Sequence, residues 1–585
     1  MTRRSPPRSR SGVPVRTSVP RDPRPRRAAR RERSRAACGS PLARRLLLAA
    51  ALALAAVGPG ACGGGEAGAG GAGGRTLVLG YAEDLQTLNP VVSTDQNAND
   101  LIFSLLFTPL VTYDSAYRVR PWLARSWELS DTSVAFELRD DVRWHDGEPV
   151  TAEDVAFTFR LAKSPAAASP LAAAYLSEVD RATVLGPHRI RFHFSAPHAQ
   201  PLQDFFWPPV PKHVLQGVDP AHLADAPFSR DPVGSGPYRL VDWKAGQGLS
   251  FRAVDSFPAG LGGPPAIRRV SYRILPEPTT RLQELLRGDL QVDGPLQPAE
   301  TPRVQDSERA RVASFPWRQF TYIGWNTRDS LFADAAVRRA LTMAIDRRAL
   351  LRAALYGHGT TAAGPIPPWH PYAPHLEPLP YAPDSARAIL AGAGWRDADG
   401  DGVLDRDGRP FRFHLLASQA NATFSDMAQM IQAQLKEVGV DVQPELLEWQ
   451  TVLGRHRARD FEAVLTNWVL DNFRIDPRPL FSTRAARTEG SANRSSYSNP
   501  TADSLMEAGV RQTDPAAAAA TWAAFERVLQ RDQPFTFLFW NDELAGIGRS
   551  LEGVHMDARG ELFTLPRWRW AGGASDGDAA DGGSR

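Results

Sequence analysis

Apolar and polar residues alternate in several short stretches of the first half of the chain. Residues 76–81 (TLVLGY), 134–138 and 190–194 each place apolar side chains at every second position. This two-residue period puts those side chains on one face of a strand, so each stretch predicts a β-strand with one buried face. Asp146-Gly147 has turn chemistry, and Thr151 with Asp154 has the spacing of a capping box, which predicts a helix start there.

The second half of the chain shows a helical period instead. Residues 335–355 and 425–438 carry apolar side chains three and four positions apart, which predicts two amphipathic helices. Gly439 ends the second helix, and the strand-like residues 440–449 follow it. Because helices alternate with strands, we expect α/β lobes with mixed sheets, and 585 residues suffice for two or three domains.

One continuous apolar run occurs near the start of the chain. Residues 46–57 (LLLAAALALAAV) follow Arg44 and Arg45 and contain no polar residue. Twelve apolar residues match the core of a signal peptide and are too few to span a bilayer comfortably. The pattern therefore predicts export, and no later segment resembles a transmembrane helix.

Charge is distributed very unevenly along the chain. The overall formal charge is +3, but residues 1–45 hold 15 arginines and only two acidic residues, so the remaining 540 residues carry a net −10. Nucleic-acid binding depends on the neutralisation of phosphates by Lys and Arg. The charge balance therefore argues against a nucleic-acid partner. Hydrophobic and charged contents of 43% and 23% are ordinary for a globular protein.

The chain has two cysteines, Cys38 and Cys62. Cleavage before Cys62 would leave one cysteine, at the first mature position, and no internal disulfide. This arrangement resembles the bacterial lipoprotein signal, which implies that the Cys62 thiol receives a diacylglycerol. The Gly- and Ala-rich residues 63–74 are typical of a tether between an anchor and a folded domain. Pro59 stands where the lipoprotein pattern prefers Leu, so secretion without a lipid is the alternative.

No catalytic constellation is found in the sequence. The motifs HExxH, GxSxG and GxxxxGK[ST] are absent, and His145, Asp146 and Glu148 have the setting of a turn. We therefore expect no enzyme activity and no cofactor, and any ATP-driven work belongs to other subunits.

An aspartate-rich stretch, DADGDGVLDRDG, covers residues 397–408. Asp397, Asp399, Asp401 and Asp405 occupy positions 1, 3, 5 and 9 of a loop that resembles a calcium loop. Gly408 stands at position 12, where an EF-hand supplies a bidentate Glu. A charged surface hairpin is the favoured interpretation, and weak calcium binding is the alternative.

Four segments together resemble the extracellular solute-binding proteins of peptide ABC importers, bacterial family 5. They are RPWLARSWELSDTSVAFELRDDVRWHDGEPVTAEDVAFTFRL (120–161), DPVGSGPYRLVDW (231–243), YIGWNTRDSLFADAAVRRALTMAIDRRALL (322–351) and YAPDSARAILAGAGW (381–395). The resemblance implies an α/β fold of the type II periplasmic-binding-protein class, with two lobes, a hinge and an extra inserted domain.

The resemblance also implies an order of domains. We expect a basic extension with a signal peptide at 1–61, a tether at 62–75, and a first lobe at 76–108, 231–312 and 536–572. The inserted domain then covers 109–230, the second lobe covers 313–535, and 573–585 form a tail that is disordered by composition.

The family pattern further implies ligand contacts in the second lobe. Trp449 and Trp468 have the separation of two tryptophans that face the ligand cleft, and Asp471 completes a Trp-x-x-Asp motif that binds the ligand's amino group. Tyr322 and Trp325 are further aromatic candidates, with core packing as the alternative.

Two sequence features leave undecided which residues bind the two ends of the ligand. Some family members have an Arg three residues before the second Trp to bind a carboxylate, whereas this chain has Leu465. Either Arg455 or Arg457 serves instead, or the ligand has no carboxylate at that distance. Asp476-Pro477 offers a second acidic position near Asp471.

The expected function is capture of a small solute, favoured to be a peptide, by a monomeric, lipid-anchored receptor that delivers it to an ABC permease. Alternatives within the same fold are an oligosaccharide, a nickel chelate or another cationic solute. A ligand sensor and an extracytoplasmic hydrolase are alternatives of other classes.

Overall fold

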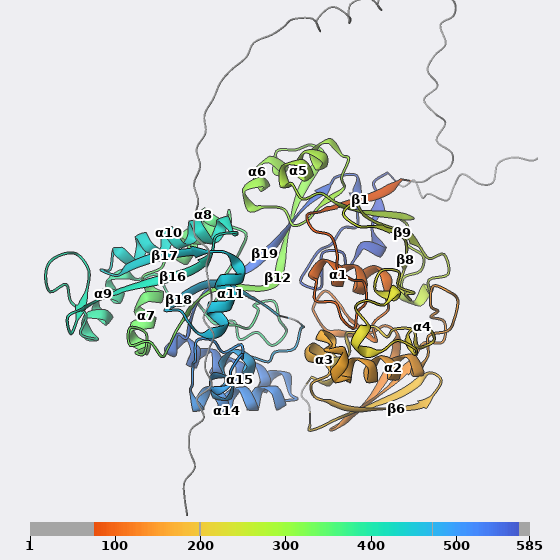
Figure 1. Cartoon of the computed structure of the whole chain (residues 1–585), viewed down its shortest axis with the longest axis horizontal. Helices are drawn as coiled ribbons and strands as arrows, with labels where there is room; N and C mark the ends of the chain where they lie inside the picture. Colours follow the sequence, from red (N-terminus) through yellow and green to blue (C-terminus); the bar gives the residue numbers. More distant parts are fainter. Residues whose placement is uncertain (1–74, 198–199, 471, 573–585) are drawn as a thin grey trace, which may run out of the picture. The chain divides into compact units, whose positions relative to one another are not determined.

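The computed structural model describes residues 75–197, 200–470 and 472–572. Its main feature is an eleven-stranded mixed sheet in which ten strands follow the order β17-β16-β18-β12-β19-β11-β1-β10-β9-β8, while β13 pairs with β19 off this path (Figure 1). The strands are β1 (Thr76–Tyr81), β8 (Tyr238–Lys244), β9 (Gly248–Ala253), β10 (Arg269–Ile274), β11 (Val292–Asp293), β12 (Ala310–Trp325), β13 (Gly359–Thr361), β16 (Arg412–Ser418), β17 (Asp441–Leu447), β18 (Ala463–Val469) and β19 (Phe535–Gly548).

Two long antiparallel strands, β12 and β19, connect the two halves of this sheet. Residues 310–316 of β12 pair with 542–548 of β19, and residues 320–324 pair with 535–540. Between the two paired stretches, Trp317, Arg318 and Gln319 lie opposite Asn541 alone. Extra residues on one strand bend and twist a ladder locally. The bulge therefore marks the point where the sheet passes from the first lobe to the second.

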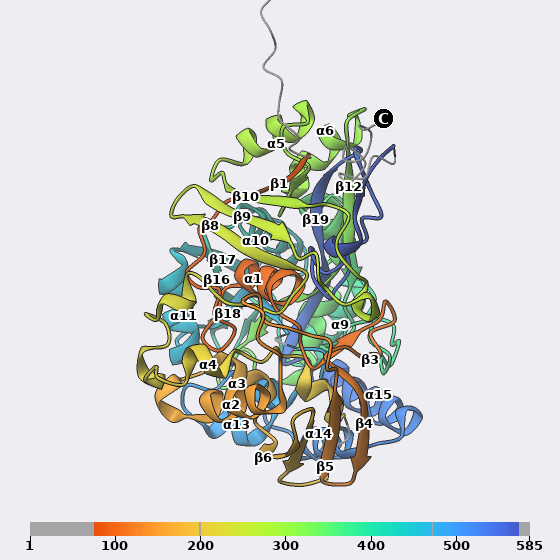
Figure 2. The same ribbon diagram turned by 90° about the vertical axis from the view of Figure 1, so that its right-hand side faces the viewer.

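A separate antiparallel sheet stands beside the first half of the large sheet. Its strands are ordered β4 (Ala124–Ser130), β5 (Ser133–Leu138), β7 (Arg189–Phe194) and β6 (Val179–Gly186). Helix α2 (Ala152–Lys163) packs on it through Phe159, whose ring centroid lies 5.7 Å from that of Phe192. Figure 2 shows α2 and α3 (Pro170–Tyr175) against this sheet. Aromatic side chains of both sheets join one core, so residues 109–230 are counted with the first lobe from here on.

The second half of the large sheet is covered on both faces. Helices α7 (Ala335–Met343), α8 (Arg347–Ala354), α9 (Pro383–Gly392) and α10 (Ala422–Lys436) contribute to one core, and α14 (Pro500–Arg511) and α15 (Pro515–Asp532) to another. Strand β12 serves both cores because successive side chains point to opposite faces. Ile323 enters the first core and Tyr322 the second. This strand is therefore buried on both sides, as the central strand of an α/β lobe must be.

The strands predicted at 76–81, 134–138 and 190–194 are confirmed as β1, β5 and β7, and the helix after Thr151 is α2. The single helix expected over 335–355 is wrong. Two helices, α7 and α8, occupy this stretch, because the Asp346 carboxylate accepts the Ala349 N–H and caps a new helix start. Helix α10 begins at Ala422, ahead of the predicted 425, because Asn421 caps it.

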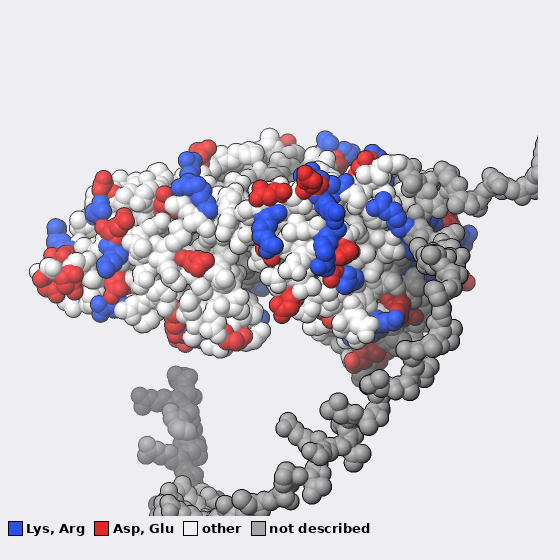
Figure 3. Space-filling model, turned by 90° about the horizontal axis from the view of Figure 1, so that it is seen from above, with Lys and Arg blue, Asp and Glu red and all other residues white. Residues whose placement is uncertain are grey.

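Within the residues that the structure describes, no helix combines the length and the apolar character needed to cross a bilayer. The face in Figure 3 carries Lys and Arg interspersed with Asp and Glu over both lobes. The mixture agrees with the moderate charge of the chain after its basic start.

Candidate functional site: a cleft between the lobes

Two adjoining cavities of about 310 and 350 Å³ lie between the lobes. They share Ala173 and Ala174 of α3 and Leu470, which follows β18. The first is lined mainly by second-lobe residues, among them Ile366, Trp369, His370, Trp468, Asn472 and Asp476. The second also reaches first-lobe residues, among them Gln96, Asn99, Asp100 and Arg559. Concave, largely apolar sites with a few polar groups are typical of small-molecule binding.

The end of β18 forms one wall of this cleft. Trp468 lines the first cavity, Val469 the second, and Leu470 both. The Leu470 N–H donates to the Arg318 carbonyl at 2.8 Å, which fixes this wall to the β12 bulge. Asp471 lies outside the described residues, but both its neighbours, Leu470 and Asn472, line the first cavity.

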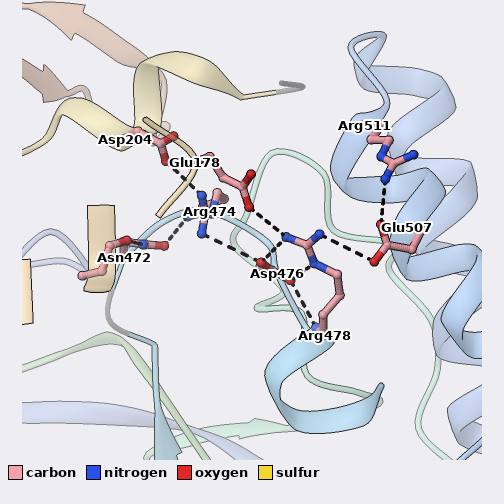
Figure 4. A network of polar contacts seen from close by, with 9 residues as sticks. Glu178, Asp204, Asn472, Arg474, Asp476, Arg478, Glu507 and Arg511 are labelled. Carbon is pink, nitrogen blue, oxygen red and sulfur yellow. Dashed lines mark hydrogen bonds and ion pairs between the residues drawn. The ribbon is translucent and has the colours of Figure 1, made fainter. Parts of the chain in front are cut away.

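The segment after Asp471 crosses to the first lobe and makes polar contacts there (Figure 4). The Asn472 side-chain amide donates to the Ala174 carbonyl at 2.6 Å. The Arg474 guanidinium lies 3.1 Å from the Asp204 carboxylate, and both side chains are largely buried. Charge-assisted hydrogen bonds are among the strongest in proteins. These contacts hold the two walls of the cleft together.

Asp476, the second acidic candidate, is occupied by arginines. Its carboxylate accepts the Nε and Nη2 protons of Arg478 at 2.8 and 2.7 Å, and Arg474 lies 3.8 Å away. Arg478 also lies 3.6 Å from Glu178 of the first lobe. The negative charge of Asp476 is therefore balanced by protein groups. The sequence analysis did not predict this network, although Arg474, Asp476 and Arg478 alternate in charge at every second position and thereby indicate ion pairs.

An aromatic cluster closes the cleft beside these ion pairs. The Phe473 ring centroid lies 4.6 Å from that of Tyr113, 5.6 Å from Tyr117 and 5.9 Å from Trp369. The Arg318 guanidinium carbon lies 5.4 Å from the Phe473 ring. Tyr113 and Tyr117 belong to the first lobe and Trp369 to the second, so Phe473 joins the lobes through stacking as well as burial.

Acidic groups gather on the first-lobe side of the hinge. Burial raises the pKa of Asp100, which lines the second cavity, to about 7. Glu561 accepts the Tyr81 hydroxyl at 2.8 Å, and burial, reinforced by Asp100 and Asp293, raises its pKa to about 8. Burial, followed by repulsion from Glu561 and Asp100, raises the pKa of Glu543 well above its usual range. Asp100 at the second cavity, with Glu561 and Glu543 near it, therefore holds its proton more tightly than an exposed carboxyl group does.

Two predicted aromatic contacts lie in the core instead of the cleft. Tyr322 is 2% exposed and stacks on Phe535 with centroids 4.1 Å apart, and Trp325 is fully buried and donates to the Thr536 hydroxyl at 3.1 Å. Their burial favours the alternative of core packing over contact with a ligand. Both belong to β12, a central strand that is covered on both faces, so neither side chain is accessible to a ligand.

The structure also shows where the other candidate ligand-binding residues lie. Trp449 begins α11 (Trp449–Ala458), is 38% exposed, and is not among the residues lining either cleft cavity. Arg455 pairs with Glu445 at 2.6 Å and Asp460 at 3.2 Å, so its charge is balanced. Arg457 is exposed, and Leu465 is fully buried in the core. Of the candidates among the described residues, the structure brings Trp468 and Asp476 to the cleft, together with the neighbours of Asp471.

The aspartate-rich loop lies on the surface of the second lobe. One carboxylate oxygen of each of Asp397, Asp399 and Asp405 lies within 4.8 Å of the others, whereas Asp401 is not part of this group. The Asp397 carboxylate accepts the N–H groups of Gly400 and Gly402, and Asp401 accepts that of Val403. Asp405–Arg406 (β14) then pairs with Arg409–Pro410 (β15). The aspartates thus stabilise a hairpin turn through backbone hydrogen bonds.

Comparisons with known proteins agree with this architecture. The family model "Bacterial extracellular solute-binding proteins, family 5 Middle" matches residues 118–488. The oligopeptide-binding protein AppA of Bacillus subtilis is 28% identical over 507 residues, 85% of this chain and 91% of that protein. The structure of AppA in complex with a nonapeptide superposes with a TM-score of 0.70 at 27% identity, covering 85% of this chain and 99% of the other. The nickel-binding periplasmic protein of Escherichia coli is 28% identical over 364 residues, 60% of this chain and 68% of that protein.

The chain therefore belongs to family 5 of the bacterial extracellular solute-binding proteins, and its fold is the two-lobed α/β fold of type II periplasmic binding proteins.

Proposed function

We propose that this protein is an exported receptor that closes around a peptide and delivers it to the permease of an ABC importer. The observation that carries the proposal is the cleft between the lobes, lined by Trp468, Leu470 and Asn472 and closed by contacts from the same segment. Family membership and the likeness to AppA, whose structure holds a nonapeptide, support the peptide as ligand.

Closure of such a cleft is driven by the ligand. A ligand favours the closed state only by binding it better than the open one, and a shift from mostly open to mostly closed needs about 5 kcal/mol. An extended peptide supplies backbone groups that a strand end such as 468–470 can recognise in any sequence. Asp471 would meet the peptide's ammonium group, since a buried charge requires a partner.

The protein is proposed to reach its place of work by export and lipidation. The leader 1–61, Cys62 as the lipid attachment site and residues 63–74 as a tether support this part of the proposal. It requires no cofactor, and we propose a monomer that is anchored in the membrane by its lipid alone. It meets the permease with both lobes closed.

Mass spectrometry of ligand retained through gentle purification tests the peptide proposal. Peptides released on denaturation, with affinity abolished by N-acetylation, are the expected result. A second candidate, a nickel chelate, is favoured by the nickel-binding relative of Escherichia coli. Retained nickel in place of peptide would establish that candidate and refute the first.

A further inference from the structure

Three arginines stand side by side on the outer face of the first-lobe sheet. Arg239 of β8 lies directly opposite Arg252 of β9, and Arg252 lies directly opposite Arg269 of β10. All three side chains are exposed. Neighbouring strands are about 4.8 Å apart, so three positive charges lie within roughly 10 Å. We call Arg239, Arg252 and Arg269 the arginine row.

Like charges directly opposite each other on a sheet are destabilising. A partner would remove this cost, yet none of the three arginines forms an ion pair with another described residue. The one acidic side chain at the adjoining cavity, Asp255, already pairs with Arg268. The row is therefore a positive site whose charge the fold leaves unbalanced.

A polar cavity of about 430 Å³ opens beside the row. Arg239 and Arg252 line it together with Arg143, which comes from the loop before α2. Trp144 also lines it, and its buried indole N–H has no acceptor among the described residues. Several guanidinium groups around a polar hollow are the chemistry that binds phosphate.

The arginine row also lies next to the start of β1, the first strand of the fold. Thr76, the first residue of β1, pairs with Arg269, so the order across the sheet is Arg239, Arg252, Arg269, Thr76. Only residues 63–74 separate Cys62 from Arg75. Twelve residues span at most about 42 Å however they are arranged. A lipid at Cys62 would hold this face of the first lobe within reach of the membrane surface.

We infer that the arginine row and Arg143 bind the phosphate groups of anionic phospholipids and hold the first lobe against the membrane beside its tether. Each basic residue near an anionic membrane contributes about 1 kcal/mol, a factor of about five, and the attraction falls as salt screens it. The proposed anchor at Cys62 explains why this face meets the membrane. Binding to vesicles needs no anchor, so the two proposals can fail separately.

The test uses residues 72–585, which form one compact unit without the basic leader and without Cys62. Cosedimentation is measured at low salt with vesicles of phosphatidylcholine alone and of phosphatidylcholine mixed with phosphatidylglycerol. The test variant is Arg239→Gln/Arg252→Gln. The control is Arg348→Gln/Arg352→Gln, which removes the same charge from two exposed positions one turn apart on α8, in the second lobe. Thermal melting verifies that both variants fold.

We expect binding to the phosphatidylglycerol vesicles only, lost in high salt. The row variant should bind at least about tenfold more weakly, since two contributions of about fivefold are removed, and the control should bind as the wild type does. Equal losses of vesicle binding in both variants would show that the effect depends on net charge alone, and would overturn the inference. Absence of vesicle binding would also overturn the inference. This holds even if inorganic phosphate raises the melting temperature of the wild type and not that of the row variant. Loss of permease binding in the row variant with vesicle binding intact would assign the surface to the permease instead.

Discussion

The Arg474 guanidinium of the second lobe lies 3.1 Å from the Asp204 carboxylate of the first lobe, and 13% and 1% of the two side chains are exposed. Because the pair joins the two walls of the cleft, we expect it to break when the cleft opens. Opening would return both charges to water, so the pair stabilises the closed state and does not hold either lobe folded. A contact of this kind links ligand affinity to closure.

Arg474→Ala should therefore weaken ligand binding while leaving the melting temperature of the ligand-free protein nearly unchanged. Hydrogen bonds to charged groups contribute about 1.5–3 kcal/mol, so we expect the dissociation constant of the co-purified ligand to rise about 10- to 100-fold by calorimetry. X-ray scattering without ligand should show a more open average shape. Arg511→Ala is the matched control, because Arg511 pairs with Glu507 inside the second lobe. An unchanged dissociation constant for Arg474→Ala would contradict the role in closure.

Asp471 and Asp476 should respond differently to the same substitution. Asp471→Asn should weaken peptide binding by about 3–5 kcal/mol, the usual cost of removing one partner of a buried charge pair. Asp476→Asn should instead lower the melting temperature, because Asp476 is held by Arg478 and Arg474. Calorimetry and thermal melting of both variants separate these effects.

Acetylation of the peptide's amino group provides the second half of this test. The modification should cost the wild type far more affinity than it costs Asp471→Asn, because the variant has already lost the carboxylate. If acetylation costs both proteins equally, Asp471 does not meet the amino group. If neither the substitution nor acetylation matters, the ligand has no amino terminus at this position.

The sequence predicted the elements whose signals are local. The strands at 76–81 and 190–194 and the cap at Thr151 are confirmed because alternation and capping act within a few residues. The break at Asp346 was missed because the apolar period continues through it, while one carboxylate starts a new helix. The spacing of apolar residues does not reveal a residue that caps a second helix inside the same amphipathic stretch.

The site was harder to predict because it depends on long-range contacts. Tyr322 and Trp325 look like cleft residues in sequence, and only the position of β12 between two helical layers shows that both are buried. Arg474 and Asp204 are 270 residues apart, so no spacing rule could pair them. Trp468 was found because the family resemblance supplies an arrangement that the residues alone do not reveal.

Calcium should leave the aspartate-rich loop and the stability of the protein unchanged. The Asp397 and Asp401 carboxylates already accept backbone N–H groups, and position 12 of the loop is Gly408. A site occupied at a hundred times its dissociation constant would add about 2.7 kcal/mol to the free energy of unfolding. We expect no such rise in the melting temperature with millimolar calcium. A large rise that Asp399→Asn abolishes would establish calcium binding instead.

Cys62→Ser should release the protein from the membrane or leave it unprocessed. The thiol is the atom that would carry the lipid, and no other cysteine follows the leader. Fractionation of cells, with mass spectrometry of the mature amino terminus, gives the result. A wild-type protein that is soluble, cleaved elsewhere and free of lipid would contradict the proposed anchor.

The buried acidic groups near the hinge should make stability fall as pH rises. Glu561 faces Tyr81, Asp100, Asp293 and Glu543, and burial raises its pKa to about 8. An unfolded Glu titrates near 4.3. The folded state therefore holds this proton more tightly, so the stabilisation is complete at low pH and is lost as pH rises from about 4.3 through about 8.

One such group changes the free energy of unfolding by up to about 1.4 kcal/mol per pH unit inside this window. We expect the melting temperature to fall between pH 5 and pH 8, and Glu561→Gln, which resembles the protonated side chain, to flatten that fall. Glu552→Gln is the control, since Glu552 is exposed and pairs with Arg569 at the surface. If Glu561→Gln does not fold, Tyr81→Phe serves in its place. Losing the hydroxyl that donates to the Glu561 carboxylate should raise the pKa further and extend the fall in stability to higher pH. A pH dependence of the melting temperature that is the same in the wild type and in Glu561→Gln would show that Glu561 is ionised in the fold.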